Sequence, residues 1–220
     1  MAIKFNQLQG KASKSGPDRF KYVDGLNQFR IVSPVIPQYK YWLTTKDGMA
    51  VPMDCLGFDR EQEKFTNKEK DWVRHYFPDK KCSWAYASFV LDRGDGKLKL
   101  IDHKKKLFEQ IILAAKRLGD PTDWDNGWDV VVERVRTGPK PYNVEYHLDQ
   151  IGCSETKGAL SDKEKEYLEE EMPNIEEFLK VPTPEEQKKF IEERILATDE
   201  DEDVDEEALE ELGKTGSDDL

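Results

Sequence analysis

The chain has few of the residues that build disulfide frameworks or membrane spans. Its three cysteines, Cys55, Cys82 and Cys153, lie far apart and are odd in number, which argues against a disulfide framework and favours a reducing compartment. No run approaches the roughly 18 apolar residues of a membrane-spanning helix, and the N-terminal MAIKFNQLQG lacks an apolar signal segment. We therefore expect a protein that stays in the cytoplasm of the cell that makes it.

Recognisable catalytic motifs are also missing. The three histidines, His75, His103 and His147, are scattered, and the sequence has no GxxxxGK[ST], GxSxG or HExxH pattern. The acidic loop 120–129 has some character of a calcium loop, but Val131 stands where the terminal glutamate would be. The sequence predicts that the protein is not an enzyme; an active site of unrecognised type is the alternative.

A metal site has little support in the cysteine spacing. Cys55, His75 and Cys82 are the candidate ligands, yet the chain contains no CxxC pair. Structural zinc usually takes four ligands that come in close pairs. We therefore expect no cofactor, with zinc as the open alternative.

Charge is distributed unevenly along the chain. Residues 1–150 carry 26 Lys and Arg against 21 Asp and Glu, whereas residues 151–220 carry 8 against 25. A basic body with a strongly acidic C-terminal third is typical of a polyanion-binding domain with an acidic tail. The overall net charge of −12 therefore does not exclude a nucleic-acid partner.

The stretch 80–106, KKCSWAYASFVLDRGDGKLKLIDHKKK, predicts a strand, a tight turn, a second strand and the start of a helix. Trp84 and Tyr86 are two apart and leave the same face of the first strand, and Lys97 and Lys99 repeat this period on the second. Aromatic rings beside cations suit single-stranded nucleic acid, whose bases stack and whose phosphates need positive charge. The alternative is an ordinary amphipathic hairpin with a solvated lysine edge.

The remaining pattern predicts a mainly β protein with helices, of the α+β class. Strands are expected at 28–33, 39–44, 129–136 and 144–150, a helix over 107–118, and a short helix within 61–76. Many short strands, hairpin turns and one helix are typical of a small barrel. An OB-fold-like barrel is the leading expectation, although spacing does not separate it from other small β-barrels.

The C-terminal third predicts helices followed by a solvated tail. Ser161 with Glu164 forms a capping-box pattern, and Thr183 followed by Pro184 opens a second helix. The predicted domains are a flexible basic arm over 1–21, an OB-fold core over 22–152 with an insertion at 51–80, an acidic helical segment over 153–197, and a disordered acidic tail over 198–220.

Several of these segments follow a familiar succession: Phe29-Arg-Ile-Val-Ser-Pro34, Lys81-Cys-Ser-Trp84 and its strand, Gly96-Lys, the helix from Lys106, and an acidic tail ending in Asp-Asp-Leu. The succession resembles the single-stranded-DNA-binding (helix-destabilising) proteins of T-even-like tailed bacteriophages over about residues 25–152. That family has an OB-fold core which binds single-stranded DNA cooperatively and without sequence preference.

The resemblance implies roles for individual residues. Arg30 matches a basic residue on the family's first strand, and Lys81 with Trp84 matches the basic-then-aromatic entry to the strand that lines the cleft. Residues 11–15, KASKS, resemble the basic arm through which neighbouring copies interact along DNA. Family members hold zinc with one His and three Cys, but only Cys55 has a counterpart here, so the insertion is expected to fold without metal.

The sequence thus predicts a protein that binds, protects and organises single-stranded DNA in phage replication, recombination and repair, inside the infected bacterium. The DNA contacts expected are Arg30, Lys40, Trp42, Lys81, Trp84, Tyr86, Lys97, Lys99, Arg134 and Arg136. The acidic tail is expected to compete with DNA and to bind replication and recombination proteins through Asp201, Glu202, Asp203, Asp205, Asp218 and Asp219. The alternative is an acidic interaction protein or DNA mimic that does not bind DNA.

Overall fold

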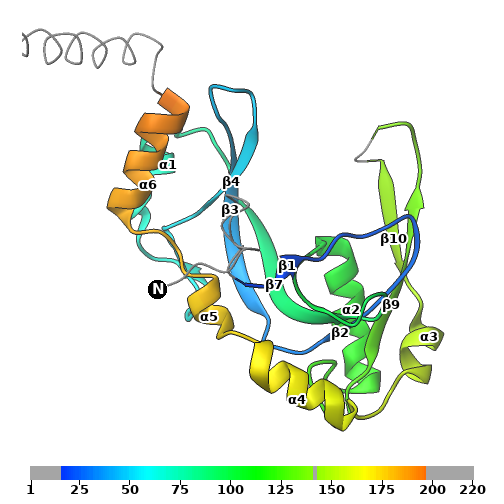
Figure 1. The fold of residues 1–220 in the computed structure, drawn as a ribbon. Helices are drawn as coiled ribbons and strands as arrows, with labels where there is room; N and C mark the ends of the chain where they lie inside the picture. Colours follow the sequence, from blue (N-terminus) through cyan, green and yellow to red (C-terminus); the bar gives the residue numbers. More distant parts are fainter. Residues whose placement is uncertain (1–15, 141–142, 197–220) are drawn as a thin grey trace, which may run out of the picture. The chain divides into compact units, whose positions relative to one another are not determined.

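A computed structural model describes residues 16–140 and 143–196 of the chain. These residues form two compact units (Figure 1). Unit 1 contains residues 16–36 and 85–180, and unit 2 contains residues 37–84 and 181–196. The chain therefore passes from one unit to the other three times. The division differs from the expected 22–152 core with its insertion at 51–80, because the second unit begins earlier and takes in a C-terminal helix.

Unit 1 is built on one twisted sheet. Its strands follow the order β1 (Asp18–Arg19), β8 (Leu98–His103), β7 (Ser83–Asp92), β2 (Gly25–Ile31), β9 (Asp129–Arg136) and β10 (Val144–Leu148). All neighbours in this series are antiparallel except β1 and β8, which are parallel. The strands expected at 28–33, 129–136 and 144–150 are present, with shifted ends.

The predicted hairpin and helix of the 80–106 stretch are confirmed. Strand β7 pairs with β8 from Tyr86 opposite His103 to Leu91 opposite Leu98. Gly96 in the turn has a φ of 68°, a conformation that glycine adopts without strain. Helix α2 (Lys105–Leu118) follows, and Gly119, with a φ of 94°, ends it.

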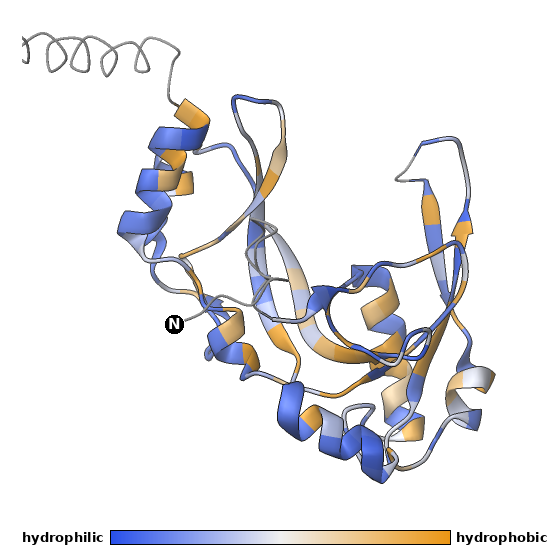
Figure 2. Cartoon of the chain, in the orientation of Figure 1, coloured by the Kyte–Doolittle hydropathy of each residue, from blue (hydrophilic) through white to orange (hydrophobic). Residues whose placement is uncertain are grey.

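Short helices cover part of the sheet of unit 1. These are α3 (Gln150–Glu155), α4 (Asp162–Glu171) and α5 (Ile175–Phe178). Leu168 and Ile175 are buried against Phe89 and Leu91 of β7, while the opposite side of α4 is polar (Figure 2). The capping box predicted at Ser161 is formed. Of the helices in the described ranges, none is long and apolar enough to cross a membrane.

The α+β class is confirmed, but the described strands do not close into a barrel. In unit 1, β8 and β10 are not paired with each other. The N-terminal residues of the unit lie between them instead: β1 pairs with β8, and the Tyr22 ring packs 4.9 Å from that of Tyr146 on β10. A two-residue strand and an aromatic contact thus stand where a closing strand pair was expected.

Unit 2 contains a hairpin and several short elements. Strand β3 (Ile36–Thr44), which begins at the last residue of unit 1, pairs with β4 (Ala50–Asp54), and β5 (Phe58–Asp59) pairs with β6 (Lys64–Phe65). A 3-10 turn at Lys68–Lys70 leads to α1 (Trp72–Tyr76). The helix expected within 61–76 is therefore confined to its last turn, and the residues before it form β6 and turns.

The C-terminal helix α6 (Pro184–Ile191), followed by a π-helical turn at Glu192–Leu196, completes the core of unit 2. Ile191 is fully buried in a cluster with Tyr41, Leu43 and Val73. The Gln187 side chain accepts a hydrogen bond from the backbone N–H of Trp72 and donates one to the backbone carbonyl of Asp54, both at 2.8 Å. The expected 153–197 segment is thus divided between the units.

Candidate nucleic-acid interface

A groove of about 400 Å³ in unit 2 combines cations with aromatic rings. Its lining contains four cationic side chains and no carboxylate; the residues are Tyr41, Phe65, Lys68, Arg74, Pro78, Lys80, Lys81 and Cys82. Within the described ranges, none of the four cations forms an ion pair. The groove therefore presents positive charge that the protein itself does not neutralise.

Short local elements position these side chains. Phe65 on β6 packs against Tyr39 and Phe58, with ring centroids 4.8 and 5.4 Å apart, and remains 38% exposed. Arg74 projects from α1, where it is exposed. A turn closed by the Lys80 N–H donating to the Phe77 carbonyl at 2.9 Å brings the two lysines to the groove.

Beneath Tyr41, the buried Asp71 carboxylate is held by two hydrogen bonds. The Tyr41 hydroxyl donates to Asp71 Oδ2 at 2.9 Å, and the Cys55 thiol donates to the same oxygen at 3.0 Å. Burial raises the pKa of the Tyr41 hydroxyl well above its usual range and raises the pKa of Cys55 to about 12. Tyr41 and Cys55 therefore stay uncharged, and the Asp71 carboxylate that they bind is not among the lining residues.

Of the DNA contacts expected from the sequence, Lys81 is the one that lines this groove. Lys68, Arg74 and Lys80 were not among the expected contacts, although Lys80 is adjacent to one of them. Lys68 and Arg74 lie in the segment 51–80, which has no clear periodicity, so no pattern in the sequence indicated their orientation. Trp84 is half-buried on β7 and is not among the lining residues.

The two expected residues on β3 lie on its outer face. Tyr41 and Leu43 point into the apolar cluster, and Trp42 between them is 56% exposed. Lys40 shares the face of Trp42, as the alternation predicts, and is half-buried. An exposed indole beside a lysine is a feature that can stack a base.

A second groove, of about 900 Å³, lies in unit 1 between residues 16–23 and the β7–β8 turn. Lys97 and Lys99 both line it, together with Arg19 and Lys21. However, the Lys99 side chain is only 18% exposed, and its ammonium lies 2.6 Å from Asp92 and 2.7 Å from Asp95. Burial alone would lower the pKa of Lys99, but these two carboxylates outweigh it and raise the pKa.

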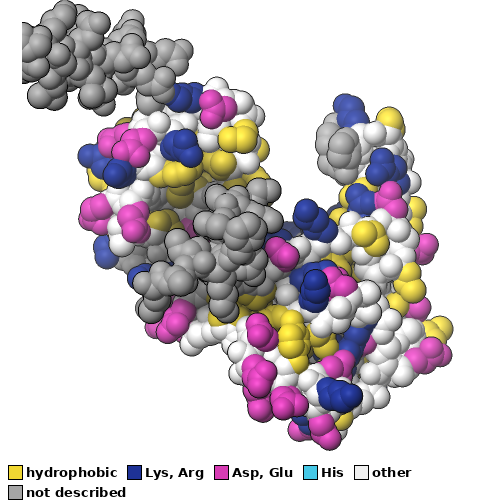
Figure 3. Space-filling model, viewed as in Figure 1, with side chains coloured by type: hydrophobic (Ala, Val, Ile, Leu, Met, Phe, Trp, Pro, Cys, Tyr) yellow, Lys and Arg dark blue, Asp and Glu magenta, His cyan; other side chains and the backbone are white. Residues whose placement is uncertain are grey.

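Neutralisation by neighbours extends to other expected contacts in unit 1. Arg134 and Arg136 on β9 both form ion pairs with Asp24. On the face shown in Figure 3, Lys and Arg side chains lie beside Asp and Glu side chains. Tyr86 is half-buried, with its ring packed 4.6 Å from that of Phe108. The structure therefore offers fewer open contacts in unit 1 than the sequence predicts.

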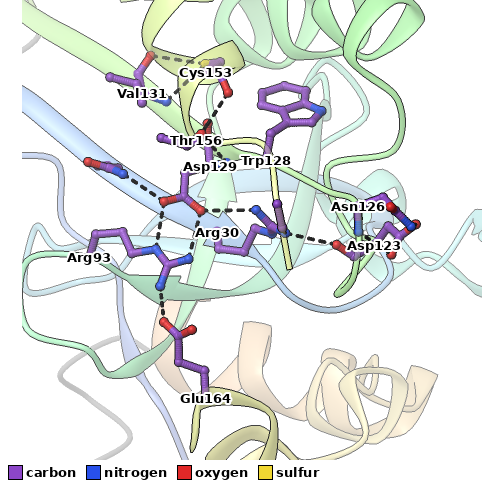
Figure 4. A network of polar contacts seen from close by, with 12 residues as sticks. Arg30, Arg93, Asp123, Asn126, Trp128, Asp129, Val131, Cys153, Thr156 and Glu164 are labelled. Carbon is purple, nitrogen blue, oxygen red and sulfur yellow. Dashed lines mark hydrogen bonds and ion pairs between the residues drawn. The ribbon is translucent and has the colours of Figure 1, made fainter. Parts of the chain in front are cut away.

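Arg30 differs most from its expected role, because its side chain is in the interior of unit 1 (Figure 4). The guanidinium lies 3.4 Å from Asp129 Oδ1 and donates to the carbonyls of Asp123 at 3.2 Å and Gly158 at 2.6 Å. Arg93 binds the same carboxylate and also pairs with Glu164 of α4. Burial lowers the pKa of Arg30, whereas Asp129 raises it.

These contacts give Arg30 a structural role. With 1% of its surface exposed, its guanidinium does not reach solvent, so it cannot contact a phosphate in this structure. The network instead joins β2, β9 and α4 through one buried carboxylate (Figure 4). In the sequence, the charge of Arg30 suggested an exposed contact. In the structure, β2 is covered on both faces at this position, so the side chain is buried.

The remaining expectations concern metal and the termini. In residues 16–140 and 143–196, no group of three or more His, Cys, Asp or Glu side chains is placed to hold a metal ion. The KASKS segment at 11–15 lies outside the described residues. So do the six acidic tail positions Asp201, Glu202, Asp203, Asp205, Asp218 and Asp219.

A comparison of the sequence with known proteins identifies a related phage protein. No family model matches the sequence. The chain is 32% identical to a protein of Escherichia phage T5 named "Probable ssDNA-binding protein", and the match covers 78% of each chain. Identity and coverage at this level show that the chain belongs to the same family as that phage T5 protein.

Proposed function

We propose that the protein binds single-stranded DNA without sequence preference and that the unit 2 groove holds part of the strand. The observation that carries this proposal is the set of four cations without a carboxylate partner around that groove. A phosphate that binds there releases counterions from the DNA, and it does not first have to displace a carboxylate of the protein. The name of the phage T5 relative supports the same partner.

Exposed aromatic rings supply the second component of binding. Phe65 is 38% exposed at the groove, and Trp42 is 56% exposed on the outer face of β3. Stacking of bases on such rings contributes on the order of 1–3 kcal/mol per base and tolerates any sequence. We assign Trp42 and Phe65 as the stacking residues, and Lys68, Arg74, Lys80 and Lys81 as the phosphate contacts.

The fold of unit 1 supports a relation to OB-fold proteins. Strand β2 pairs with both β7 and β9, and α2 connects β8 to β9. This order of pairing agrees with a partly open, five-stranded Greek-key barrel. We propose that unit 1 is a divergent OB-like core of the kind found in the T-even-like helix-destabilising proteins, with residues 18–22 in place of a closing strand pair.

The biological setting follows from the family. We propose that the protein protects single-stranded DNA during phage replication, recombination and repair in the cytoplasm of the infected bacterium, without catalytic activity of its own. We further propose that the acidic residues beyond 197 dock replication and recombination proteins when DNA displaces them from the basic surface. Opposite charge makes this exchange favourable at low salt.

Fluorescence anisotropy with a labelled oligo-dT tests the proposal. The variant Lys80→Ala/Lys81→Ala removes two rim cations from the unit 2 groove, and Lys116→Ala/Lys163→Ala removes two exposed lysines of α2 and α4 as a matched control. We expect the groove variant to weaken binding about tenfold at low salt. The slope of log affinity against log salt should fall by about 0.7 for each phosphate that the variant no longer neutralises.

Two outcomes would count against this assignment. Equal weakening in both double variants would show a general charge effect and would remove the groove from the proposal. If the unmodified protein binds neither single- nor double-stranded oligonucleotides, the interaction protein or DNA mimic becomes the better explanation.

A further inference from the structure

Two arginines on β9 both form ion pairs with one carboxylate of the protein. Arg134 and Arg136 are two residues apart, so their side chains leave the same face of the strand. The Asp24 carboxylate pairs with both: Oδ1 contacts Nη1 of Arg134, and Oδ2 lies 3.3 Å from Nη2 of Arg136. One carboxylate held by two guanidinium groups resembles the way arginines hold a phosphate.

The backbone before β2 delivers Asp24 to this place. Tyr22, two residues earlier, is anchored by its packing against Tyr146 and Phe29. Gly25 follows with a φ of 89° and lies directly opposite Arg134 in the β2–β9 pairing. The chain therefore turns at Gly25 and places the Asp24 side chain over the arginine pair.

We propose that Asp24 is an internal substitute for a DNA phosphate, which occupies the Arg134–Arg136 pair in the free protein and yields it to single-stranded DNA. The inference rests on the proposed function and adds a second phosphate site and its regulation. The face of β9 that carries the arginines also presents Tyr146 from β10, because it is the partner of Arg134 in the register. An aromatic ring thus lies beside the two cations.

The exposure of the pair makes exchange feasible. Asp24 and Arg136 each have 53% of their side-chain surface exposed, and Arg134 has 15%. The Asp24–Arg136 pair contributes little net stability, because water and salt already screen it. Arg134 is mostly covered, but the carboxylate that must leave is exposed. Lys99 is the contrast, because its partner Asp92 is only 17% exposed and Asp95 binds it as well. Displacing two carboxylates there would cost more.

The consequence is a reduced affinity for DNA in the unmodified protein. A phosphate that binds the arginine pair must first displace Asp24, so its net binding free energy is smaller than that of a phosphate at a vacant pair. Removing the carboxylate charge removes this competition. We expect Asp24→Asn to bind single-stranded DNA about threefold more tightly at low salt, which corresponds to an exposed ion pair.

The test compares variants that have the same net charge. Asp18→Asn is the matched control, because Asp18 lies in the same N-terminal segment, is exposed, and is not a partner of the arginines. Binding of labelled oligo-dT is measured for the unmodified protein, Asp24→Asn and Asp18→Asn. The measurement is repeated with each substitution in an Arg134→Gln/Arg136→Gln background. Asp24→Ser repeats the test with a smaller side chain, and thermal melting of each variant confirms that it is folded.

The proposal requires a gain of about threefold in Asp24→Asn and Asp24→Ser beyond that of Asp18→Asn, and the disappearance of this difference in the arginine-free background. Equal effects of the Asp24 and Asp18 substitutions would overturn it, as would a gain that persists without the arginines. In either case the proposed function stands if the unmodified protein binds DNA. Absence of DNA binding by the unmodified protein would overturn both.

Discussion

The Arg93 guanidinium donates to both carboxylate oxygens of Asp129, at 2.8 Å from Nε and 3.0 Å from Nη2. Arg30 shares this carboxylate from the buried side. Because Asp129 is 4% exposed, its removal leaves the Arg30 charge in the interior without a counter-ion. We expect Asp129→Ala to lower the free energy of unfolding by about 3–5 kcal/mol.

Glu164→Ala is the control for this network, because Glu164 contacts Arg93 at the more exposed end. Because the Glu164 side chain also accepts a hydrogen bond in the Ser161 capping box, we expect a loss of about 1–2 kcal/mol. Urea denaturation of the three proteins measures both values. Similar losses for the two variants would contradict the central position of Asp129.

His103 makes the stability of unit 1 depend on pH. The ring is buried, Nε2 lies 2.8 Å from Ser88 Oγ, and burial lowers the pKa to about 3. In the unfolded chain the same residue takes up a proton near pH 6.5. Between these values the unfolded state binds more protons, so stability falls as the pH drops from about 6.5 towards 3.

The expected slope is at most about 1.4 kcal/mol per pH unit from this group. Urea denaturation at pH 7, 6 and 5 should show the decline in the unmodified protein and a flatter profile in His103→Gln. A profile that is equally steep in both would assign the decline to other groups.

Substitution of Trp42 should weaken DNA binding and leave the stability of the protein nearly unchanged. Its ring is 56% exposed, so Trp42→Ala should change the free energy of unfolding by less than about 1 kcal/mol. If one base stacks on this ring, affinity for oligo-dT should fall by about fivefold to a hundredfold. Trp42→Phe should retain part of that affinity.

Trp128 is the comparison residue, because its ring is fully buried and its indole N–H donates to the Gly119 carbonyl at 2.9 Å. Trp128→Ala should destabilise unit 1 by about 3–5 kcal/mol. A loss of affinity in Trp42→Ala that merely follows a loss of folded protein would refute the stacking role.

Deletion of residues 198–220 tests the proposed acidic competitor. The deleted segment contains the acidic run at 199–211. Its removal should tighten oligo-dT binding at low salt. The effect should be smaller at high salt, where charges are screened. Titrations at about 0.05 and 0.3 M salt measure the difference. Unchanged or weaker binding of the shortened protein at low salt would rule the competition out.

Regular elements could be predicted from local chemistry. The β7–β8 hairpin follows from two alternating segments around a glycine turn, and α2 from apolar residues at helical spacing closed by Gly119. The capping box at Ser161 forms as its spacing predicts, and the helix predicted after Thr183 begins there. In each case the signal lies within a few residues and does not depend on distant parts of the chain.

The candidate site was less predictable, because partners distant in sequence decide which charges are available. The sequence indicates an exposed contact at Arg30. In the structure its buried side chain pairs with Asp129, which lies about 100 residues later in the chain. Arg134 and Arg136 look free until Asp24 is placed beside them by the β2–β9 register. Lys68 and Arg74 join Lys81 only through the packing of the irregular segment 51–80.

The position of Ile191 in the core of unit 2 has a consequence for biosynthesis. That unit begins at residue 37, but its apolar cluster needs a side chain more than 150 residues later. A ribosome therefore produces most of unit 2, and all of the described part of unit 1, before the last piece of that cluster exists. Unit 2 should complete its folding late, and until then the apolar surface around Tyr41 and Val73 remains exposed to chaperones and proteases.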